Sequence, residues 1–411
     1  MSSRRSAFSV RQAASAFLLA ALFATASFAA TYKRVYNFTG ASDGGDPATT
    51  LSFDSLGNAY GTTAAGGDFG FGTVFMLSPD GQQTTLYSFT GGGDGLSPHG
   101  GVILDAAGNL YGTTVAGGFG GICAGDGCGV VFELSPNNGS WTLIPLYAFR
   151  GGNDGFGPGS GLIFDGAGNL YGTAPDGGAK SNGVVFKLSP TKNGWKLKVI
   201  HTFTGGKDGS VGSLGSLLLD AAGNLYGVSE LGGPAGAGAA YELSPTPSGP
   251  WKTTILYDFK GMPDSANPYG GLIFDAVGNL YGTTYFGGTA GMGTVFQLAH
   301  GPNGSWQENI LYNFQGGTDG SFPTTTLLFD AAGNLYGTTS TGGRPSCDCG
   351  TVFKLTLSRG SWSDKIVHVF GKKPDGSYPN YGLTVDPAGN LVGTAPVGGT
   401  GGQGIVFQIA P

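Results

Sequence analysis

Short apolar runs separated by turn-forming segments recur along almost the whole chain. Residues 255–259, 271–275, 279–284 and 294–298 are four such runs, and each has only five or six residues. Glycine-containing segments lie between them. Runs of this length with turn signals on both sides are typical of β-strands and are too short for ordinary helices. The pattern predicts an all-β fold in which four short strands form one unit.

The four-strand unit repeats seven times. Each copy contains the phrase Asp-x-x-Gly-Asn, and successive copies are 51 to 60 residues apart. The first residues of these phrases are Asp54, Asp105, Asp165, Asp220, Asp275, Asp330 and Asp386. We interpret the aspartates as turn residues, because an Asp side chain can accept hydrogen bonds from turn amides and glycine tolerates a positive φ. Four strands per repeat indicate propeller blades, so we predict a seven-bladed β-propeller with four antiparallel strands per blade.

The strand order at the two ends predicts how the ring closes. We name the strand positions of a blade a (innermost) to d (outermost), with residues 271–275 at position a and 255–259 at position d. After residue 29, the first apolar run, 32–38, is of the d type, and the last run, 405–409, is of the c type. Pairing the N-terminal outer strand with the last blade would complete that blade and remove an open sheet edge. We therefore expect residues 30–411 to form a single seven-bladed propeller domain.

Residues 1–29 have the features of a secretory signal peptide. They carry three arginines, then an apolar run over 13–26, and end on the small-x-small sequence Ser27-Phe28-Ala29. The alternative is a retained membrane helix, but the run is shorter than the roughly 20 residues that a span needs. No other apolar stretch of this length occurs, so we expect no membrane span in the mature chain. We expect cleavage of residues 1–29 and export to the periplasm or the extracellular space.

Composition narrows the classes of partner. The chain has 81 glycines, 40% hydrophobic and 11% charged residues, and a formal net charge of −6 at pH 7. It is too apolar for a disordered chain, and its glycines lack the strict third-residue spacing of collagen. The net acidity argues against nucleic acid or an anionic membrane as a partner. No coiled coil is present, so a monomer is the default expectation.

The repeated phrases also carry a family resemblance. Leu-Tyr-Gly-Thr-Thr, Gly-Gly, Gly-Thr-Val-Phe and Leu-Tyr-x-Phe recur in combination through residues 32–409. This combination resembles the GloVer tandem-repeat family, also called choice-of-anchor tandem-repeat proteins. Residues 271–284 are similar to the blade core of NHL-like β-propellers. The resemblance implies a secreted or surface protein, and it brings neither an established activity nor catalytic residues to transfer.

Four cysteines form two close pairs in the loops between b and c strands. These pairs are Cys123 with Cys128 and Cys347 with Cys349. In an exported protein, local disulfides are the expected state of such pairs. Metal binding is the alternative, but two thiolates supply only half of a zinc coordination shell. We predict two disulfides.

Calcium is the one metal that the loops between d and a strands could hold. Each of these loops contains an Asp, and the adjacent glycines could add carbonyl oxygens. The candidates are Asp94, Asp154, Asp208 and Asp319. The loops lack the closely spaced aspartates of an established calcium loop, and Asp-Gly is also a common turn pair. A turn role is therefore the first interpretation, with calcium as the alternative, and we expect no other cofactor.

The a strands favour a non-catalytic protein. They are almost wholly apolar, whereas a metal-dependent propeller enzyme needs carboxylates converging near the axis. The loop face formed by the b–c and d–a loops carries most departures from the repeat, and repeat proteins usually differentiate there. The candidate binding residues on this face are Asp176, Glu230, Tyr285, Phe286 and Arg344. We expect a binding or scaffold module for a protein or glycan. The alternatives are a carbohydrate- or lactone-active enzyme with its site on the same loops, and a purely structural envelope component.

Overall fold

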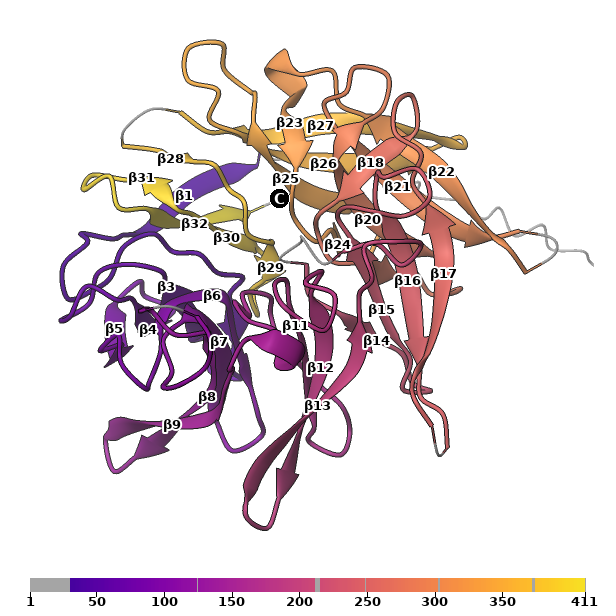
Figure 1. The fold of residues 1–411 in the computed structure, drawn as a ribbon. Helices are drawn as coiled ribbons and strands as arrows, with labels where there is room; N and C mark the ends of the chain where they lie inside the picture. Colours follow the sequence, from indigo (N-terminus) through magenta and orange to yellow (C-terminus); the bar gives the residue numbers. More distant parts are fainter. Residues whose placement is uncertain are drawn as a thin grey trace, which may run out of the picture.

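The computed structural model describes residues 30–123, 125–210, 215–247, 249–301, 304–371 and 374–410. The expected signal peptide, residues 1–29, lies outside this described part of the chain. The described residues form seven antiparallel blades around a common axis, so the predicted seven-bladed β-propeller is confirmed (Figure 1). No helix in the described ranges is long and apolar enough to cross a membrane.

Each blade contains one strand at every position from a to d. Position a is occupied by β2 (Ser52–Phe53), β6 (Leu96–Leu104), β10 (Ile163–Phe164), β14 (Leu218–Leu219), β19 (Ile273–Phe274), β24 (Leu328–Phe329) and β29 (Thr384–Val385). Position b is occupied by β3 (Ala59–Thr63), β7 (Leu110–Ala116), β11 (Leu170–Ala174), β15 (Leu225–Ser229), β20 (Leu280–Gly287), β25 (Leu335–Thr341) and β30 (Leu391–Ala395). Position c is occupied by β4 (Thr73–Leu77), β8 (Val130–Asn137), β12 (Val184–Thr191), β16 (Ala239–Ser244), β21 (Thr294–His300), β26 (Thr351–Ser358) and β32 (Ile405–Ala410). Position d is occupied by β5 (Gln83–Ser88), β9 (Ser140–Ala148), β13 (Gly194–Thr202), β17 (Lys252–Asp258), β22 (Trp306–Asn313), β27 (Ser361–Val369) and β1 (Thr31–Asn37).

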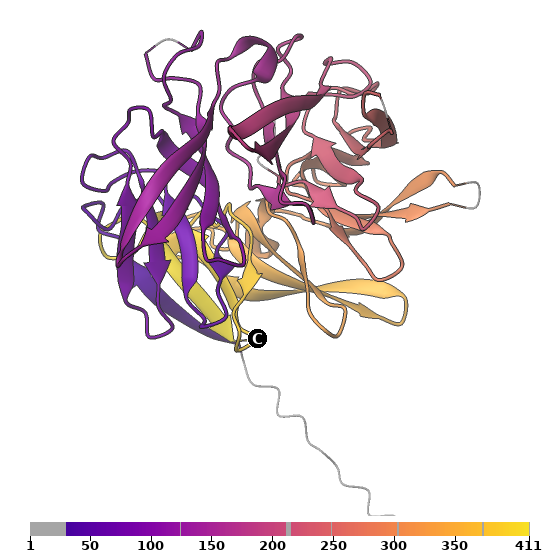
Figure 2. The same ribbon diagram turned by 90° about the horizontal axis from the view of Figure 1, so that it is seen from below.

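Several short elements lie in the loops. The strands β18 (Ser265–Pro268) and β23 (Ser321–Pro323) pair with b strands, and β28 (Gly376–Ser377) pairs with β31 (Val397–Gly398). Two 3-10 turns are η1 (Gly152–Asp154) and η2 (Gly317–Asp319). Hairpins of c and d strands, such as β21 with β22 in orange, project from the ring (Figure 2).

The a strands are shorter than the sequence pattern predicts. All of them except β6 contain two residues, whereas the apolar runs suggested five. The difference arises because the small residues before each a strand turn toward the axis and pack against the neighbouring blade. A Cβ atom added to Gly270 would lie only 2.4 Å from the Thr325 carbonyl oxygen. The strand pairing therefore begins later than the apolar run does.

The ring closes as predicted. The N-terminal β1 pairs with the C-terminal β32, and Tyr32 lies opposite Ile409 in the register. Figure 1 shows indigo β1 beside yellow β32. The last blade therefore combines three strands from the C-terminus with one from the N-terminus, which gives the two chain ends one shared sheet.

Aromatic pairs join neighbouring blades around the core. Phe259, after the d strand of the fourth blade, packs edge-on against Phe296 on the c strand of the fifth, with ring centroids 5.1 Å apart. Equivalent pairs occur at every interface, including Phe38 with Phe75 where the ring closes. The glycine of Leu-Tyr-Gly-Thr-Thr makes room for this ring, since a Cβ on Gly282 would lie 2.6 Å from Phe296 Cζ. Buried edge-to-face pairs contribute about 0.5–1.5 kcal/mol each beyond their burial.

Candidate binding site at the propeller axis

A pocket of about 510 Å³ opens at the propeller axis. Its lining includes residues from all seven blades, from Thr50 in the first to Gly382 in the last, and this places it at the axis. The lining residues lie near the start of an a strand or near the end of a b strand. The pocket therefore lies on the face that carries the b–c and d–a loops.

The lining is strongly asymmetric around the ring. The first three blades contribute only Thr50 and three glycines, Gly100, Gly159 and Gly161. The remaining four blades contribute all the aromatic rings, most of the hydroxyl groups and the Glu230 carboxyl group. Although the repeats are similar, the side chains that could contact a ligand come mainly from the last four blades.

The inner wall of the pocket is built mostly from backbone. The small residues before neighbouring a strands approach so closely that a Cβ on Gly100 would lie 2.6 Å from the Ser160 carbonyl carbon. Threonines of the b strands fix this arrangement across blade boundaries. Thr283 Oγ1 donates to the Thr325 carbonyl oxygen at 3.0 Å, and Thr394 Oγ1 donates to that of Thr49 at 2.8 Å. Hydrogen bonds and close backbone packing between blades therefore fix the shape of the inner wall.

Aromatic side chains form one side of the pocket. The Tyr285 ring stacks on Phe322 with centroids 4.8 Å apart, and the Phe286 ring stands perpendicular to Tyr285 at 4.7 Å. Tyr269 lies 6.1 Å from Tyr285, measured between ring centroids. Phe286 remains 45% exposed, so this cluster borders the open mouth of the pocket. Two further lining tyrosines, Tyr378 and Tyr381, come from the last blade.

Glu230 supplies the carboxyl group of the pocket. It directly follows β15 and occupies the repeat position held by Tyr285 and Ser340 in the next two blades. Burial raises the pKa of Glu230. Asn267 Nδ2 donates to its backbone oxygen at 3.2 Å and fixes the main chain there. Within the described ranges, the Glu230 carboxylate has no hydrogen-bond or ion-pair partner.

Two tyrosines of the lining, Tyr269 and Tyr381, have raised pKa values. Burial raises the pKa of Tyr269, and the nearby Glu230 carboxylate and Tyr285 phenol add to the increase. Burial likewise raises the pKa of Tyr381, with smaller contributions from Asp46 and Tyr269. These phenols are neutral at ordinary pH and can donate hydrogen bonds to a ligand.

The sixth blade adds hydroxyl groups. Its lining residues are Thr324, Thr325, Thr326, Ser340 and Thr341. Thr324 Oγ1 and Ser340 Oγ lie 3.4 Å apart, and Thr326 Oγ1 accepts a hydrogen bond from the Gly271 amide at 2.9 Å. Hydroxyl groups can act as donors or acceptors. The pocket therefore combines aromatic faces, adaptable hydroxyls and one carboxyl group.

The candidate residues predicted from the sequence fall into two groups. Glu230, Tyr285 and Phe286 line the axial pocket together. Asp176 and Arg344 do not line it. Asp176 is exposed one residue farther along its loop, and the Arg344 guanidinium lies beside Gly371 at the outer side of its blade.

Sequence reasoning missed Tyr378 and the hydroxyl side of the pocket. A usable signal was the position directly after the five-residue segment equivalent to Leu-Tyr-Gly-Thr-Thr, which reads Ala, Val, Pro, Glu, Tyr, Ser and Pro around the ring. The large and polar residues at this position fall in three consecutive blades, as Glu230, Tyr285 and Ser340. Consecutive blades are neighbours in the ring, so these three residues are expected to lie on the same side of the pocket.

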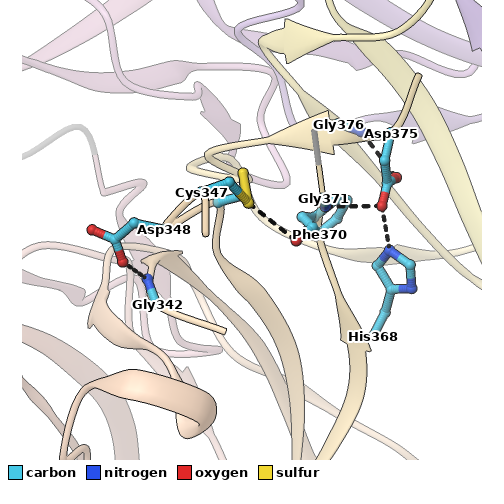
Figure 3. Close-up of a disulfide and its surroundings, with 9 residues drawn as sticks. Gly342, Cys347, Asp348, His368, Phe370, Gly371, Asp375 and Gly376 are labelled. Carbon is cyan, nitrogen blue, oxygen red and sulfur yellow. Dashed lines mark hydrogen bonds and ion pairs between the residues drawn. A yellow bond between two sulfur atoms is a disulfide. The ribbon is translucent and has the colours of Figure 1, made fainter. Parts of the chain in front are cut away.

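Both predicted disulfides are present. Cys123 bonds to Cys128, and Cys347 bonds to Cys349. The second disulfide lies in the b–c loop of the sixth blade, near the contact between His368 and Asp375 (Figure 3). Both disulfides brace loops on the face that carries the pocket.

The calcium candidates lie in four different blades and accept hydrogen bonds from the protein. Tyr147 OH and the Arg150 amide donate to Asp154 Oδ2 at 2.9 and 3.0 Å. Asp94 and Asp319 accept equivalent bonds from a tyrosine and a backbone amide, and Asp208 pairs with His201 at 3.2 Å. Among the described residues, no group of three His, Cys, Asp or Glu side chains is suited to a metal. The geometry is that of a loop-stabilising aspartate.

The repeats also match a known family. Residues 7–218 and 212–411 match the Gloeobacter/Verrucomicrobia repeat. The chain belongs to the Gloeobacter/Verrucomicrobia repeat family. This confirms the resemblance to the GloVer family, and no curated protein matches the chain.

Solved structures are similar to this Gloeobacter/Verrucomicrobia repeat protein at low sequence identity. A proposed 6-phosphogluconolactonase from Bacteroides uniformis ATCC 8492 is 14% identical with a TM-score of 0.50, and the match covers 86% of this chain and 98% of that one. A proposed oxidoreductase (glucose dehydrogenase) from Thermus thermophilus is 14% identical with a TM-score of 0.48, over 93% of this chain and 100% of that one. At 14% identity, the likeness to the first of these structures concerns the fold alone.

Proposed function

We propose that this protein is an exported, non-catalytic binding module whose axial pocket holds part of a glycan. The observation that carries the proposal is the combination of Tyr269, Tyr285 and Phe286 with a hydroxyl-rich wall in one open pocket. Its volume of about 510 Å³ falls within the range of roughly 300–1,000 Å³ typical of small-ligand sites.

Sugar chemistry fits both sides of this pocket. The apolar face of a pyranose ring packs on an aromatic ring, and its hydroxyl groups need partners that can donate or accept. The aromatic cluster provides the first contact, and Thr324, Ser340 and Thr341 provide the second. The open mouth would let a longer chain extend beyond the bound unit.

The acid content of the pocket favours binding over hydrolysis. Among the described lining residues, Glu230 is the only carboxylate. Most glycoside hydrolases use two carboxyl groups about 5–9.5 Å apart. A single carboxylate among the described lining residues does not supply such a pair.

An exported location fits the covalent structure. Disulfides persist in oxidising compartments, and Cys123–Cys128 and Cys347–Cys349 are both closed. Together with the expected cleavage of residues 1–29, this supports export to the periplasm or beyond. The propeller would then meet glycans or glycan-bearing surfaces.

The test is titration calorimetry of residues 30–411 with a panel of soluble tetrasaccharides. The panel contains cellotetraose, xylotetraose, maltotetraose, N-acetylated chitotetraose and chitosan tetraose. Tyr285→Ala should weaken binding of the preferred sugar at least tenfold, about 1.4 kcal/mol. Val115→Ala is the matched control, because Val115 holds the same repeat position in the second blade and does not line the pocket.

Two results would overturn the proposal. One is that no member of the panel binds, and the other is that Tyr285→Ala binds as well as Val115→Ala does. Release of shorter sugars during the titration would support the alternative, a carbohydrate-active enzyme on the same face.

A further inference from the structure

We propose that the glycan bound at the axis carries a protonated amino group, which sits beside Glu230 between the rings of Tyr269 and Tyr285. This inference rests on the proposed function and specifies the sugar class as an amino sugar with a free amine. Three features of the pocket carry it: the carboxylate, the rings and the missing counter-charge.

The first feature is a partly buried carboxylate without a protein partner. The Glu230 side chain lines the pocket, and no described residue forms a hydrogen bond or ion pair with its carboxylate. Burying a charged group is costly unless it is paired. Burial accordingly raises the pKa of Glu230. A ligand cation would supply the missing partner and restore the ordinary ionisation of the acid.

The second feature is the pair of aromatic rings beside the carboxylate. Tyr269 and Tyr285 lie 6.1 Å apart between ring centroids, with their planes inclined by 43°. Glu230 and Tyr269 line the same pocket, and the Glu230 charge adds to the increase in the pKa of Tyr269 that burial causes. An ammonium group within about 6 Å of a tyrosine ring face is attracted to it. Rings and carboxylate therefore favour the same kind of ligand group.

The third feature is the charge of the surroundings. No lysine, arginine or histidine is among the described residues that line the pocket. Two basic side chains of the same face, Lys180 and Arg344, lie outside the lining, and the chain as a whole carries a formal charge of −6. A positive group in this pocket would have to come from the ligand. Acidic surroundings would also favour its approach.

A metal ion is a poorer occupant. Calcium takes six to eight oxygen ligands and usually several carboxylates. The described part of the lining offers a single carboxylate, with hydroxyls of the sixth blade on its other side. An organic ammonium group needs only the carboxylate and the ring faces.

The experiment compares two ligands with the same sugar backbone, which differ at nitrogen: one carries charged amines and the other carries neutral acetamides. Chitosan tetraose has four free amines, and N-acetylated chitotetraose is the same chain with neutral amides. We expect the wild-type protein at pH 6 to bind chitosan tetraose at least tenfold more tightly. Glu230→Gln should abolish this preference while leaving the melting temperature nearly unchanged, and Asp176→Asn should keep the preference. Asp176 is the control because it is an exposed acid of the same face outside the pocket.

The outcomes separate this inference from the proposed function. Equal binding of both tetrasaccharides, or a preference that survives Glu230→Gln, overturns the amino-sugar assignment and leaves a neutral glycan site. Failure of every tetrasaccharide removes the proposed function itself. Nα-acetyl-lysine amide is a third ligand, and binding of this compound without any sugar would overturn the inference in favour of a protein partner.

Discussion

One aspartate organises the turn between the a and b strands in every blade. Asp275 Oδ1 accepts from the Val277 and Asn279 amides at 3.0 and 2.9 Å, and Oδ2 accepts from Asn279 Nδ2 at 2.7 Å and Tyr281 OH at 3.1 Å. Although burial opposes ionisation, these hydrogen bonds hold the pKa of Asp275 below its ordinary value. Gly278 adopts a φ of +88°, which a residue with a Cβ would reach only with strain. The repeated phrase is thus explained by turn formation.

Replacing this aspartate should destabilise the protein. We expect Asp275→Ala to lower the free energy of unfolding by about 1–3 kcal/mol, because it leaves four donors without their acceptor. Urea denaturation of the two proteins measures the difference. Asp68→Ala is the control, since Asp68 is exposed in a loop and should change stability by less than about 0.5 kcal/mol. Equal stabilities of the two variants would contradict the turn role.

Where the outer strands of neighbouring blades meet, a tyrosine of one strand binds a loop aspartate, and an acid of the next strand lies close to that aspartate. Tyr257 on β17 donates to Asp264 at 3.1 Å, and the next outer strand, β22, brings Glu308 to the same place. Burial and the neighbouring Asp264 carboxylate raise the pKa of Glu308 from its ordinary 4.5 to about 8. Asp364 on β27 shows the same effect beside Asp319, where its pKa is raised to about 6. At both blade interfaces the acid therefore binds its proton more tightly than it would in water.

This arrangement makes stability depend on pH. Between pH 4.5 and about 8 the folded protein binds the Glu308 proton more tightly than the unfolded chain does, so the free energy of unfolding should fall as pH rises. Glu308→Gln keeps the hydrogen-bonding shape without the charge. It should raise stability at pH 8 by about 1–3 kcal/mol and have little effect at pH 4.5. Urea denaturation at both pH values measures this, and an identical pH profile in the variant would contradict it.

At the scale of the whole molecule, the ring depends on the pairing of its two ends. Strand β1 leads into Phe38 of the aromatic pair with Phe75, and Tyr32 OH donates to Asp375 at 2.6 Å across the neighbouring blade interface. Without β1, the strand β32 would expose an unpaired edge and the adjoining cores would open.

Deletion of residues 30–38 tests this dependence. We expect the shortened protein to lose its cooperative thermal transition or to aggregate, since edge strands promote association. Differential scanning calorimetry with size-exclusion chromatography would detect either result. The matched control is deletion of residue 30 alone, which leaves β1 intact. A shortened protein that melts like this control would show that the ring does not depend on β1.

The sequence predicted the features that depend on residues close to one another along the chain better than those that depend on contacts between blades. The Asp-x-x-Gly-Asn turns are local, and the strand order of residues 32–38 and 405–409 left one way to complete the last blade. The pocket depends on which loops reach the axis. Glu230 and Tyr285 do so because they hold the same repeat position at the end of a b strand, whereas the loop of Arg344 carries its guanidinium outward, beside Gly371. The short a strands escaped prediction because they depend on packing between blades.

The axial pocket is the place where we propose that a glycan binds. The most direct measurement is a crystal structure of residues 30–411 with chitosan tetraose. We predict one sugar ring against Tyr285, with its amino nitrogen within hydrogen-bond distance of the Glu230 carboxylate. A sugar bound elsewhere, for example at the 81% exposed Phe119 of the second blade, with the axial pocket left without a sugar, would contradict the account.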